Sequence, residues 1–330
     1  MQEIDGLTAF GQTLRNGARR FPDRKDRRHA GQMLLPEVHP GFTLTPGDTV
    51  FTIGSCFARN VEDALVARGL NVPTAGFAAP VAEAPGRPNR ILNQYNPGTM
   101  LQCLRDIDGG ETGAGLYPHG GQVIDCLLAT GSRPVAQDRA LERRAQIRRL
   151  YAEGLVAAST VVVTLGLIES WYDRIAGLYL NEAPTRKILN AEPERFSFRQ
   201  IEIDECREMV LELLDRLVDD STRRVLLTVS PVPLQVTFAG GDATLRNAYS
   251  KATLRVVAEE AARHFPEVDY FPSYEMVGSL GLSAFGEDNV HVRPAVVDRV
   301  IGHMTGLYLR DDLPGPPITG PAEELRARAF

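Results

Sequence analysis

Four short segments of the chain are almost continuously apolar and rich in β-branched or aromatic residues: 48–53, 160–165, 224–229 and 268–271. Alternating polar and apolar residues predict a strand with one solvated face, whereas an unbroken apolar run predicts a strand buried on both faces. Strands of the second kind form parallel sheets that helices cover on both sides. The sequence therefore predicts a doubly wound α/β fold with a mainly parallel sheet.

Segments with helical periodicity separate these strands. After the first strand, apolar residues recur at helical spacing up to Gly69, namely Phe57, Val61, Ala64 and Leu65. Residues 70–73 predict a second short strand, which would complete a βαβ unit. Further helices are expected at about 138–153, 199–218, 246–264 and 295–309.

The chain is organised as one domain with additions. We expect a single α/β domain over residues 46–310, interrupted by two long insertions at about 74–158 and 172–198. Long excursions at strand ends in such folds usually build the substrate site. Residues 1–45 contain a basic cluster at 19–28 with little apolar content and predict a peripheral arm. The proline-rich residues 311–330 predict a tail that wraps the surface or is disordered.

Composition excludes several classes of protein. The 330 residues include 36 basic and 42 acidic ones, and this net charge of −6 does not favour nucleic-acid binding. The sequence has no apolar run of about 18 residues and no signal-like N-terminus, so we expect a cytoplasmic protein without membrane insertion. Four cysteines without a C-x-x-C pair, and histidines without ligand spacing, predict reduced thiols, no metal and no cofactor. The oligomeric state cannot be inferred.

Polar residues fall where the carboxyl ends of the predicted strands meet, which is where open α/β sheets bind ligands. Gly54-Ser55-Cys56 follows the first strand, residues 166–171 follow the second, and Asp288-x-x-His291 precedes the last helix. A serine, a histidine and an aspartate in one crevice are the set that nucleophilic acyl chemistry requires. A serine in the first turn of a helix also has free backbone N–H groups beside it, which suit an oxyanion.

Each of these residues also has a structural interpretation. Ser55 is placed to cap the following helix, and Asp288 with His291 fits a cap beside a surface imidazole. Cys56 is an alternative nucleophile, because the dipole at a helix N-terminus lowers the pKa of a thiol. Successive side chains in a tight turn point apart, so we expect Ser55 to face the cleft and Cys56 to pack behind it. Taken together, the serine and the late Asp-x-x-His favour catalysis.

Five further residues near the crevice are candidates for substrate binding. Trp171 and Tyr172 fit the wall of a sugar or acyl pocket, or alternatively the core. Glu169 could accept a hydrogen bond from a substrate hydroxyl or lie on the surface. Tyr249 and Lys251 begin a predicted helix, and Lys251 could bind an anionic group or be solvated.

The stretch Gly54-Ser55-Cys56-Phe57-Ala58 spells the five letters that name the GSCFA family, which this sequence resembles. Weaker points of resemblance lie at 93–97, 164–166, 230–233, 247–251, 270–275 and 288–291, so the likeness covers about 48–292. It implies a relation to the SGNH/GDSL esterases and acyltransferases, with their flavodoxin-like three-layer fold. Carried over, Ser55 is the nucleophile, His291 is the base and Asp288 orients the base.

The sequence departs from the SGNH pattern at one position. SGNH enzymes carry a Gly-x-Asn-Asp block, whereas Gly166-Leu167-Ile168-Glu169 has Ile168 in place of the asparagine that donates to the oxyanion. The oxyanion donors expected here are Ser55, Gly166 and, as a substitute, Asn96. The predicted function is a serine esterase or O-acyltransferase that forms an acyl-Ser55 intermediate from a small-molecule or glycan acyl ester. The alternatives are an inactive carbohydrate-binding module, which Ile168 favours, and a Cys56-dependent acyltransferase.

Overall fold

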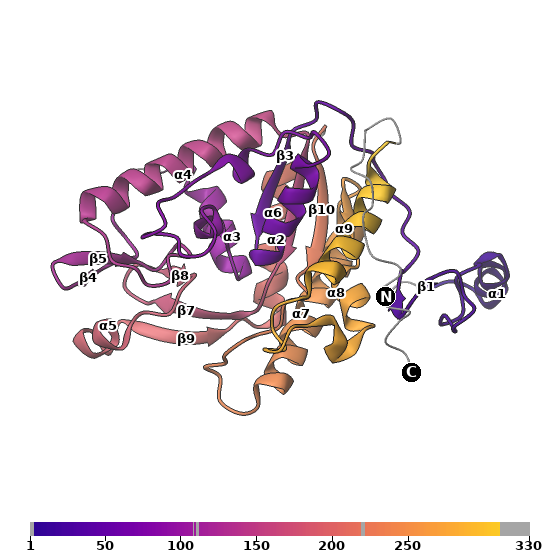
Figure 1. Cartoon of the computed structure of the whole chain (residues 1–330). Coiled ribbons are helices and arrows are strands. Elements are labelled where there is room, and N and C mark those ends of the chain that lie inside the picture. The colour runs from indigo at the N-terminus through magenta and orange to yellow at the C-terminus, as the bar shows by residue number, and fades with distance from the viewer. Residues whose placement is uncertain (1–2, 108, 110–111, 219–221, 311–330) are drawn as a thin grey trace.

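A four-stranded parallel sheet forms the centre of the molecule (Figure 1). The computed structural model describes residues 3–107, 109, 112–218 and 222–310. The strands are ordered β11-β10-β6-β3, and every neighbouring pair is parallel. They are β3 (Val50–Gly54), β6 (Thr160–Leu165), β10 (Arg224–Val229) and β11 (Val268–Tyr270). The predicted α/β fold with a parallel sheet is confirmed.

Helices cover both faces of this sheet. Along β3, Val50 belongs to one apolar cluster and Phe51 and Ile53 to another, because successive side chains of a strand point to opposite faces. The first cluster includes α2 (Cys56–Val66), α8 (Ser273–Gly278) and α9 (Pro294–Tyr308). The second includes α3 (Pro97–Arg105), α4 (Gln137–Ala157), α6 (Ile203–Val218) and α7 (Ala243–His264).

The predicted strand at residues 70–73 is wrong. Asn71 makes an isolated parallel bridge to Thr49, and the chain then enters the 3₁₀ helix η1 (Pro73–Gly76). Proline has no N–H group to donate to a ladder, so Pro73 ends the pairing there. The parallel neighbour of β3 is instead β6, which follows the whole first insertion.

The second insertion builds a small antiparallel sheet next to the carboxyl end of β6. It consists of β7 (Glu169–Asp173), β8 (Leu178–Leu180) and β9 (Phe196–Gln200), with β7 in the middle, and α5 (Arg186–Ala191) lies between β8 and β9. The helix expected to begin at residue 199 begins at Ile203, because the preceding residues pair with β7 as β9.

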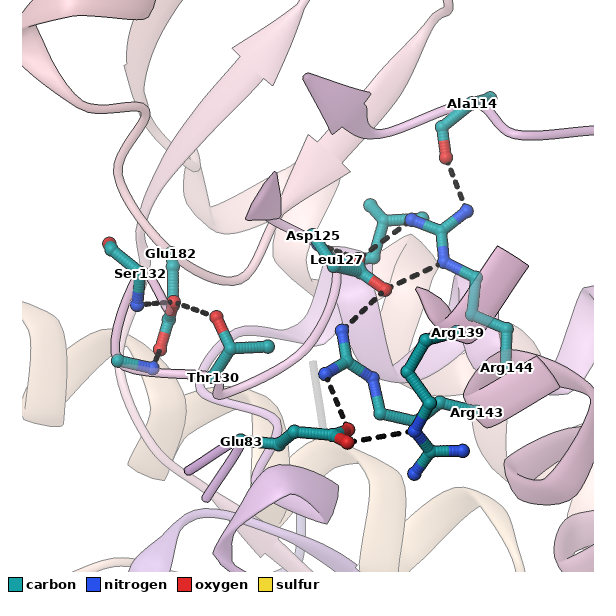
Figure 2. A network of polar contacts seen from close by, with 11 residues as sticks. Glu83, Ala114, Asp125, Leu127, Thr130, Ser132, Arg139, Arg143, Arg144 and Glu182 are labelled. Carbon is teal, nitrogen blue, oxygen red and sulfur yellow. Dashed lines mark hydrogen bonds and ion pairs between the residues drawn. The ribbon is translucent and has the colours of Figure 1, made fainter. Parts of the chain in front are cut away.

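The first insertion contains η2 (Arg90–Leu92), α3, the hairpin β4 (Leu116–His119) and β5 (Gln122–Asp125), and α4. Arginines on one face of α4 hold it to the rest of the insertion (Figure 2). Arg144 donates to both oxygens of Asp125 at 2.7 and 2.8 Å, and Glu83 accepts from Arg139 at 2.7 Å and from Arg143 at 3.1 Å. Buried ion pairs of this kind require the partners to be in place together, so α4 is fixed as part of the domain.

A carboxylate from the second insertion binds the first. Glu182 accepts hydrogen bonds from Thr130 Oγ1 and from the backbone N–H groups of Gly131 and Ser132, at 2.6 to 3.0 Å (Figure 2). The two insertions therefore form one continuous layer beside the carboxyl edge of the sheet.

The N-terminal residues are only partly integrated. Helix α1 (Gly6–Arg15) has no buried residue and stands apart from the domain in Figure 1. After it come β1 (His29–Ala30) and β2 (Met33–Leu34), in which Met33 is fully buried. The predicted tail at 311–330 lies outside the described residues. Within the described part of the chain, no helix is both long and apolar enough to cross a bilayer.

Candidate active site

Ser55 lies at the junction between β3 and α2, where the chain turns sharply. Gly54 has a φ of +139°, and a Cβ added there would stand 2.3 Å from the carbonyl oxygen of Thr164, so only glycine fits. Ser55 is the N-cap of α2, but its side chain makes no capping hydrogen bond. Its Oγ is buried and has no hydrogen-bond partner among the described residues. The hydroxyl is therefore not used to stabilise the helix.

Three chain segments converge around this hydroxyl. Gln94 N–H donates to Gly54 O at 2.8 Å, which holds residues 93–95 beside the end of β3. A Cβ added to Gly166 would lie 2.5 Å from Tyr95 O and 3.4 Å from Ser55 Cβ, so Gly166 packs directly against both segments. The close approach explains why a glycine follows β6.

Buried polar atoms without partners gather in the same segments. Besides Ser55 Oγ, they include Asn93 Oδ1, Gln94 Oε1 and Thr164 Oγ1. A buried polar atom that lacks a hydrogen bond destabilises the fold, so such atoms are uncommon unless a ligand or water satisfies them. Their concentration at the carboxyl ends of β3 and β6 indicates a functional site.

Lys251, on α7, contacts the Gly166 backbone beside Ser55. It is 1% exposed, and its Nζ donates a 2.6 Å hydrogen bond to Gly166 O. Burial lowers its pKa to about 7, while the nearby Cys56 thiol acts in the opposite direction. Lys251 therefore fixes the Gly166 backbone against Ser55, and it is not a solvated lysine.

Cys56 is the first residue of α2 and is partly exposed, whereas Ser55 is 4% exposed. This is the opposite of the exposure expected from the sequence, in which Cys56 packs behind Ser55. Burial raises the pKa of the Cys56 thiol, although Lys251 and the N–H groups of Cys56 and Phe57 oppose the shift. At neutral pH the thiol is therefore mostly protonated.

Asp288 and His291 form a pair in the loop before α9. The distance from Asp288 Oδ2 to His291 Nδ1 is 2.5 Å, and Asp288 Oδ1 accepts from the N–H groups of Val290 and His291, each at 3.0 Å. These hydrogen bonds, that to the imidazole first, hold the pKa of Asp288 well below its usual range. The His291 side chain, whose Nδ1 contacts Asp288, is 77% exposed.

The direction of α9 places this pair at the same edge of the sheet as Ser55. At the C-terminal end of α9, Leu44 N–H donates to Tyr308 O, close to the start of β3. Helix α9 is therefore antiparallel to the strands and begins near their carboxyl ends. No hydrogen bond joins His291 to Ser55 in the described structure. The structure thus brings Asp288 and His291 together and leaves Ser55 separate from them.

Of the groups predicted to donate hydrogen bonds to the oxyanion, Ser55 N–H and the Asn96 side chain already make hydrogen bonds within the protein. Ser55 N–H donates to Thr164 O at 3.3 Å, and Asn96 caps α3 by accepting from Thr99 N–H at 3.0 Å. The Asn96 amide points to Leu180 O, 3.5 Å away. The first N–H groups of a helix have no intrahelical acceptor, and those of Cys56 and Phe57 in α2 lie close enough to the Cys56 thiol to lower its pKa.

The predicted substrate-binding residues separate into two groups. Glu169 is buried and accepts from Thr237 Oγ1 at 2.7 Å and from Phe238 N–H at 3.2 Å, so it anchors the loop after β10. Trp171 lies with Glu169 around a cavity of about 150 Å³ that also includes Tyr95.

The other group lies away from this cavity. Tyr172 packs edge-on against Tyr179, with the Arg199 guanidinium 3.4 Å from its ring centroid. Tyr249 is 46% exposed on α7. Neither lines the cavity around Trp171.

A larger cavity, of about 800 Å³, lies between α3, α4 and α6. A cavity of this size could hold a ligand, but none of the residues predicted for catalysis or binding lines it. Several of its polar side chains are paired within the protein, such as Arg144 with Asp125 and Arg105 with Glu212. The carboxyl edge of the sheet, where unpartnered polar atoms gather, is therefore the stronger candidate.

No group of three metal-binding side chains occurs in the part of the chain that the structure describes. A protein-family model described as the GSCFA family matches residues 49–304. The match runs from the start of β3 into α9, so it includes Ser55, Asp288 and His291. A comparison with curated proteins finds no significant match.

Proposed function

The chain belongs to the GSCFA family, and we propose that it is an SGNH-like serine esterase or O-acyltransferase. The Ser55 hydroxyl is the observation that carries this proposal. It is buried at the start of a helix with no hydrogen-bond partner in the described part of the chain, and backbone N–H groups and the helix dipole favour negative charge there. A hydroxyl that served only as a helix cap would bind the first turn, and this one does not.

In the proposed reaction, Ser55 Oγ attacks the acyl carbonyl and His291 Nε2 accepts its proton. Asp288 holds Nδ1, which fixes the tautomer and stabilises the imidazolium. The carbonyl oxygen becomes an oxyanion, which the N–H groups of Cys56 and Phe57 can stabilise. His291 then protonates the leaving alcohol, and water or an acceptor alcohol releases the acyl group from Ser55.

The exposed position of His291 implies one conformational step. Catalytic hydrogen bonds are often long or absent before substrate binds and tighten in the complex. We infer that the loop around Asp288 and His291 moves as a unit toward Ser55, because three hydrogen bonds hold the aspartate to it. O-acylated carbohydrate is the substrate class we expect, by analogy with the wider superfamily.

Covalent labelling tests the nucleophile directly. The wild type and Ser55→Ala are treated with a fluorophosphonate, and the modified peptide is identified by mass spectrometry. The proposal requires the label on Ser55 and hydrolysis of a chromogenic acetyl ester by the wild type. A wild type that is neither labelled nor active on any acyl ester or thioester would instead favour a carbohydrate-binding module.

A Cys56-dependent acyltransferase is the second candidate, because Cys56 is more exposed than Ser55 and has Lys251 nearby. In that mechanism the Cys56 thiol attacks the carbonyl of an acyl thioester, the bond from that carbonyl to the donor sulfur breaks, the donor leaves as a thiol that takes the Cys56 proton, and a new thioester forms on Cys56. Labelling of Cys56 by an acyl thioester donor, retained in Ser55→Ala, would support this candidate.

A further inference from the structure

Three aromatic side chains, Trp171 on β7, Phe198 on β9 and Phe238 in the loop after β10, line a small cavity. The centroid of the Trp171 ring is 6.0 Å from that of Phe198 and 5.3 Å from that of Phe238, with the rings edge to face. The cavity, of about 150 Å³, is called the aromatic pocket below. Glu169 holds the Phe238 loop over it by the two hydrogen bonds described above.

Two of the segments that line the aromatic pocket also lie beside Ser55. Tyr95 and Leu167 line it, and Leu167 N–H donates to Tyr95 O at 2.8 Å. Gly166, which immediately precedes Leu167, packs against both Tyr95 O and Ser55 Cβ. The residues that line the pocket at 95 and 167 are therefore held next to the segment that packs against Ser55.

The size and lining of the aromatic pocket define what it can hold. Pockets that enclose drug-sized ligands measure about 300 Å³ or more, so this one holds a smaller group. The rings of Trp171, Phe198 and Phe238 contact one another edge to face and make this part of the lining apolar. Trp171 Nε1 is buried and has no acceptor among the described residues, so one donor is available to a polar atom of a ligand.

We propose that the aromatic pocket binds the acyl group of the substrate and selects acyl chains of about two to five carbons. The inference rests on the proposed function, since it assigns the acyl side of the ester to this pocket and leaves the alcohol outside. Each methylene of the acyl chain that is buried in the pocket stabilises the bound transition state, which should raise kcat/KM about fourfold per methylene until the pocket is full. A longer chain then meets Ala183 and the aromatic rings.

Chain-length selectivity tests this assignment. We expect wild-type kcat/KM for p-nitrophenyl esters to rise from acetate to butyrate and to fall at least tenfold at octanoate. Ala183→Leu should lower the butyrate-to-acetate ratio at least tenfold, and Phe238→Ala should raise the octanoate-to-butyrate ratio by a similar factor. The matched controls are Ala191→Leu and Phe21→Ala, which change exposed residues and should leave both ratios as in the wild type. Ratios that stay within twofold in both pocket variants would overturn the assignment.

Binding can be measured without turnover, because Trp171 is the single tryptophan of the chain. Methyl butyrate added to Ser55→Ala should change its fluorescence at concentrations at which methyl octanoate has no effect. An unchanged fluorescence would count against the pocket even if esters are hydrolysed. A fluorescence response from a protein that hydrolyses no ester would support the pocket and overturn the proposed function.

Discussion

The two halves of the candidate catalytic site differ in how they are held. Ser55 is 4% exposed and lies between a core strand and a helix, whereas the side chains of Asp288 and His291 are 47% and 77% exposed in a loop. Changes on the Ser55 side affect packed neighbours, so they alter both stability and activity. Changes in the loop affect few contacts, so they should alter activity alone. Five predictions test this contrast.

The largest effect is expected from loss of the nucleophile or the base. Ser55→Ala and His291→Ala should each lower kcat for a chromogenic acetyl ester by about 10³-fold or more. Because the members of a triad act as a unit, the double variant should be hardly worse than either single variant. Circular dichroism checks that each variant is folded. Losses that multiply in the double variant would show that the two side chains do not act in the same step.

Asp288→Ala should have a smaller effect on the same reaction. The aspartate orients the imidazole and stabilises its charge, but it neither attacks nor transfers the proton. In a well-studied triad, removal of the orienting aspartate lowers kcat by a factor about 10² smaller than removal of the serine does. A steady-state assay beside His291→Ala measures the difference. If Asp288→Ala were as inactive as Ser55→Ala and still folded, the aspartate would have a more direct role than we assign to it.

Lys251 makes the stability of the buried half depend on pH above about 7. Its pKa is about 7 in the folded protein, against 10.5 for an unperturbed lysine, because burial disfavours the charge. Between these values the unfolded chain binds a proton that the folded chain does not, so the free energy of unfolding rises with pH. The expected slope is about 1.4 kcal/mol per pH unit from pH 7 upward.

Lys251→Met should remove this slope. Urea unfolding of both proteins from pH 7.0 to 8.5 measures it, and the range ends there because the Cys56 thiol, whose pKa is raised by burial, contributes in the opposite direction at higher pH. Over that range the wild type should gain about 2 kcal/mol relative to the variant. Parallel curves would mean that Lys251 stays charged when folded, with a counter-ion that the described contacts do not include.

The same contrast explains what the sequence could predict. Three of the four strands, β3, β6 and β10, are almost continuously apolar and buried, so the pattern of their residues predicts a parallel sheet covered on both faces. The Ser55 junction was found because Gly54 and Ser55 directly follow such a strand. The predicted strand at residues 70–73 is wrong because apolar residues alone do not indicate that Pro73 ends the pairing with β3 after a single bridge.

The aromatic pocket could not be predicted in full. Trp171 was a candidate, but its partners Phe198 and Phe238 are distant in sequence and meet it only through strand register and the Glu169 hydrogen bonds. The exposure of His291 was equally hidden, because a local Asp-x-x-His spacing specifies the hydrogen bond within the pair and says nothing of its distance from Ser55. The sequence therefore predicts contacts between residues close in the chain, but not the distances between segments that meet only in the folded protein.

The unpartnered hydroxyl of Ser55 predicts a smaller effect, on stability. A buried hydroxyl without a hydrogen bond destabilises a fold by about 1–3 kcal/mol, so Ser55→Ala should raise the free energy of unfolding by about 1 kcal/mol. His291→Ala should leave it within about 0.5 kcal/mol of the wild type, since the side chain is exposed. Denaturant titrations at one pH compare the three proteins. A less stable Ser55→Ala would show that the hydroxyl binds something, such as an ordered water, in the free protein.

The smallest effect is expected from Cys56→Ser. On the proposed reaction Cys56 contributes its backbone N–H, which serine retains, and its thiol is protonated at neutral pH because burial raises the pKa. Turnover of the acetyl ester should stay within about threefold of the wild type, which is less than 1 kcal/mol in the barrier. Stability should fall only modestly, because a hydroxyl replaces a thiol in a partly buried position.

The informative comparison is with Ser55→Ala in the same assay, since the two substitutions change neighbouring atoms at one helix start. If Ser55→Ala kept its activity and Cys56→Ser lost it, the nucleophile would be the more exposed of the two residues. The contrast between a buried nucleophile and an exposed base would then no longer hold.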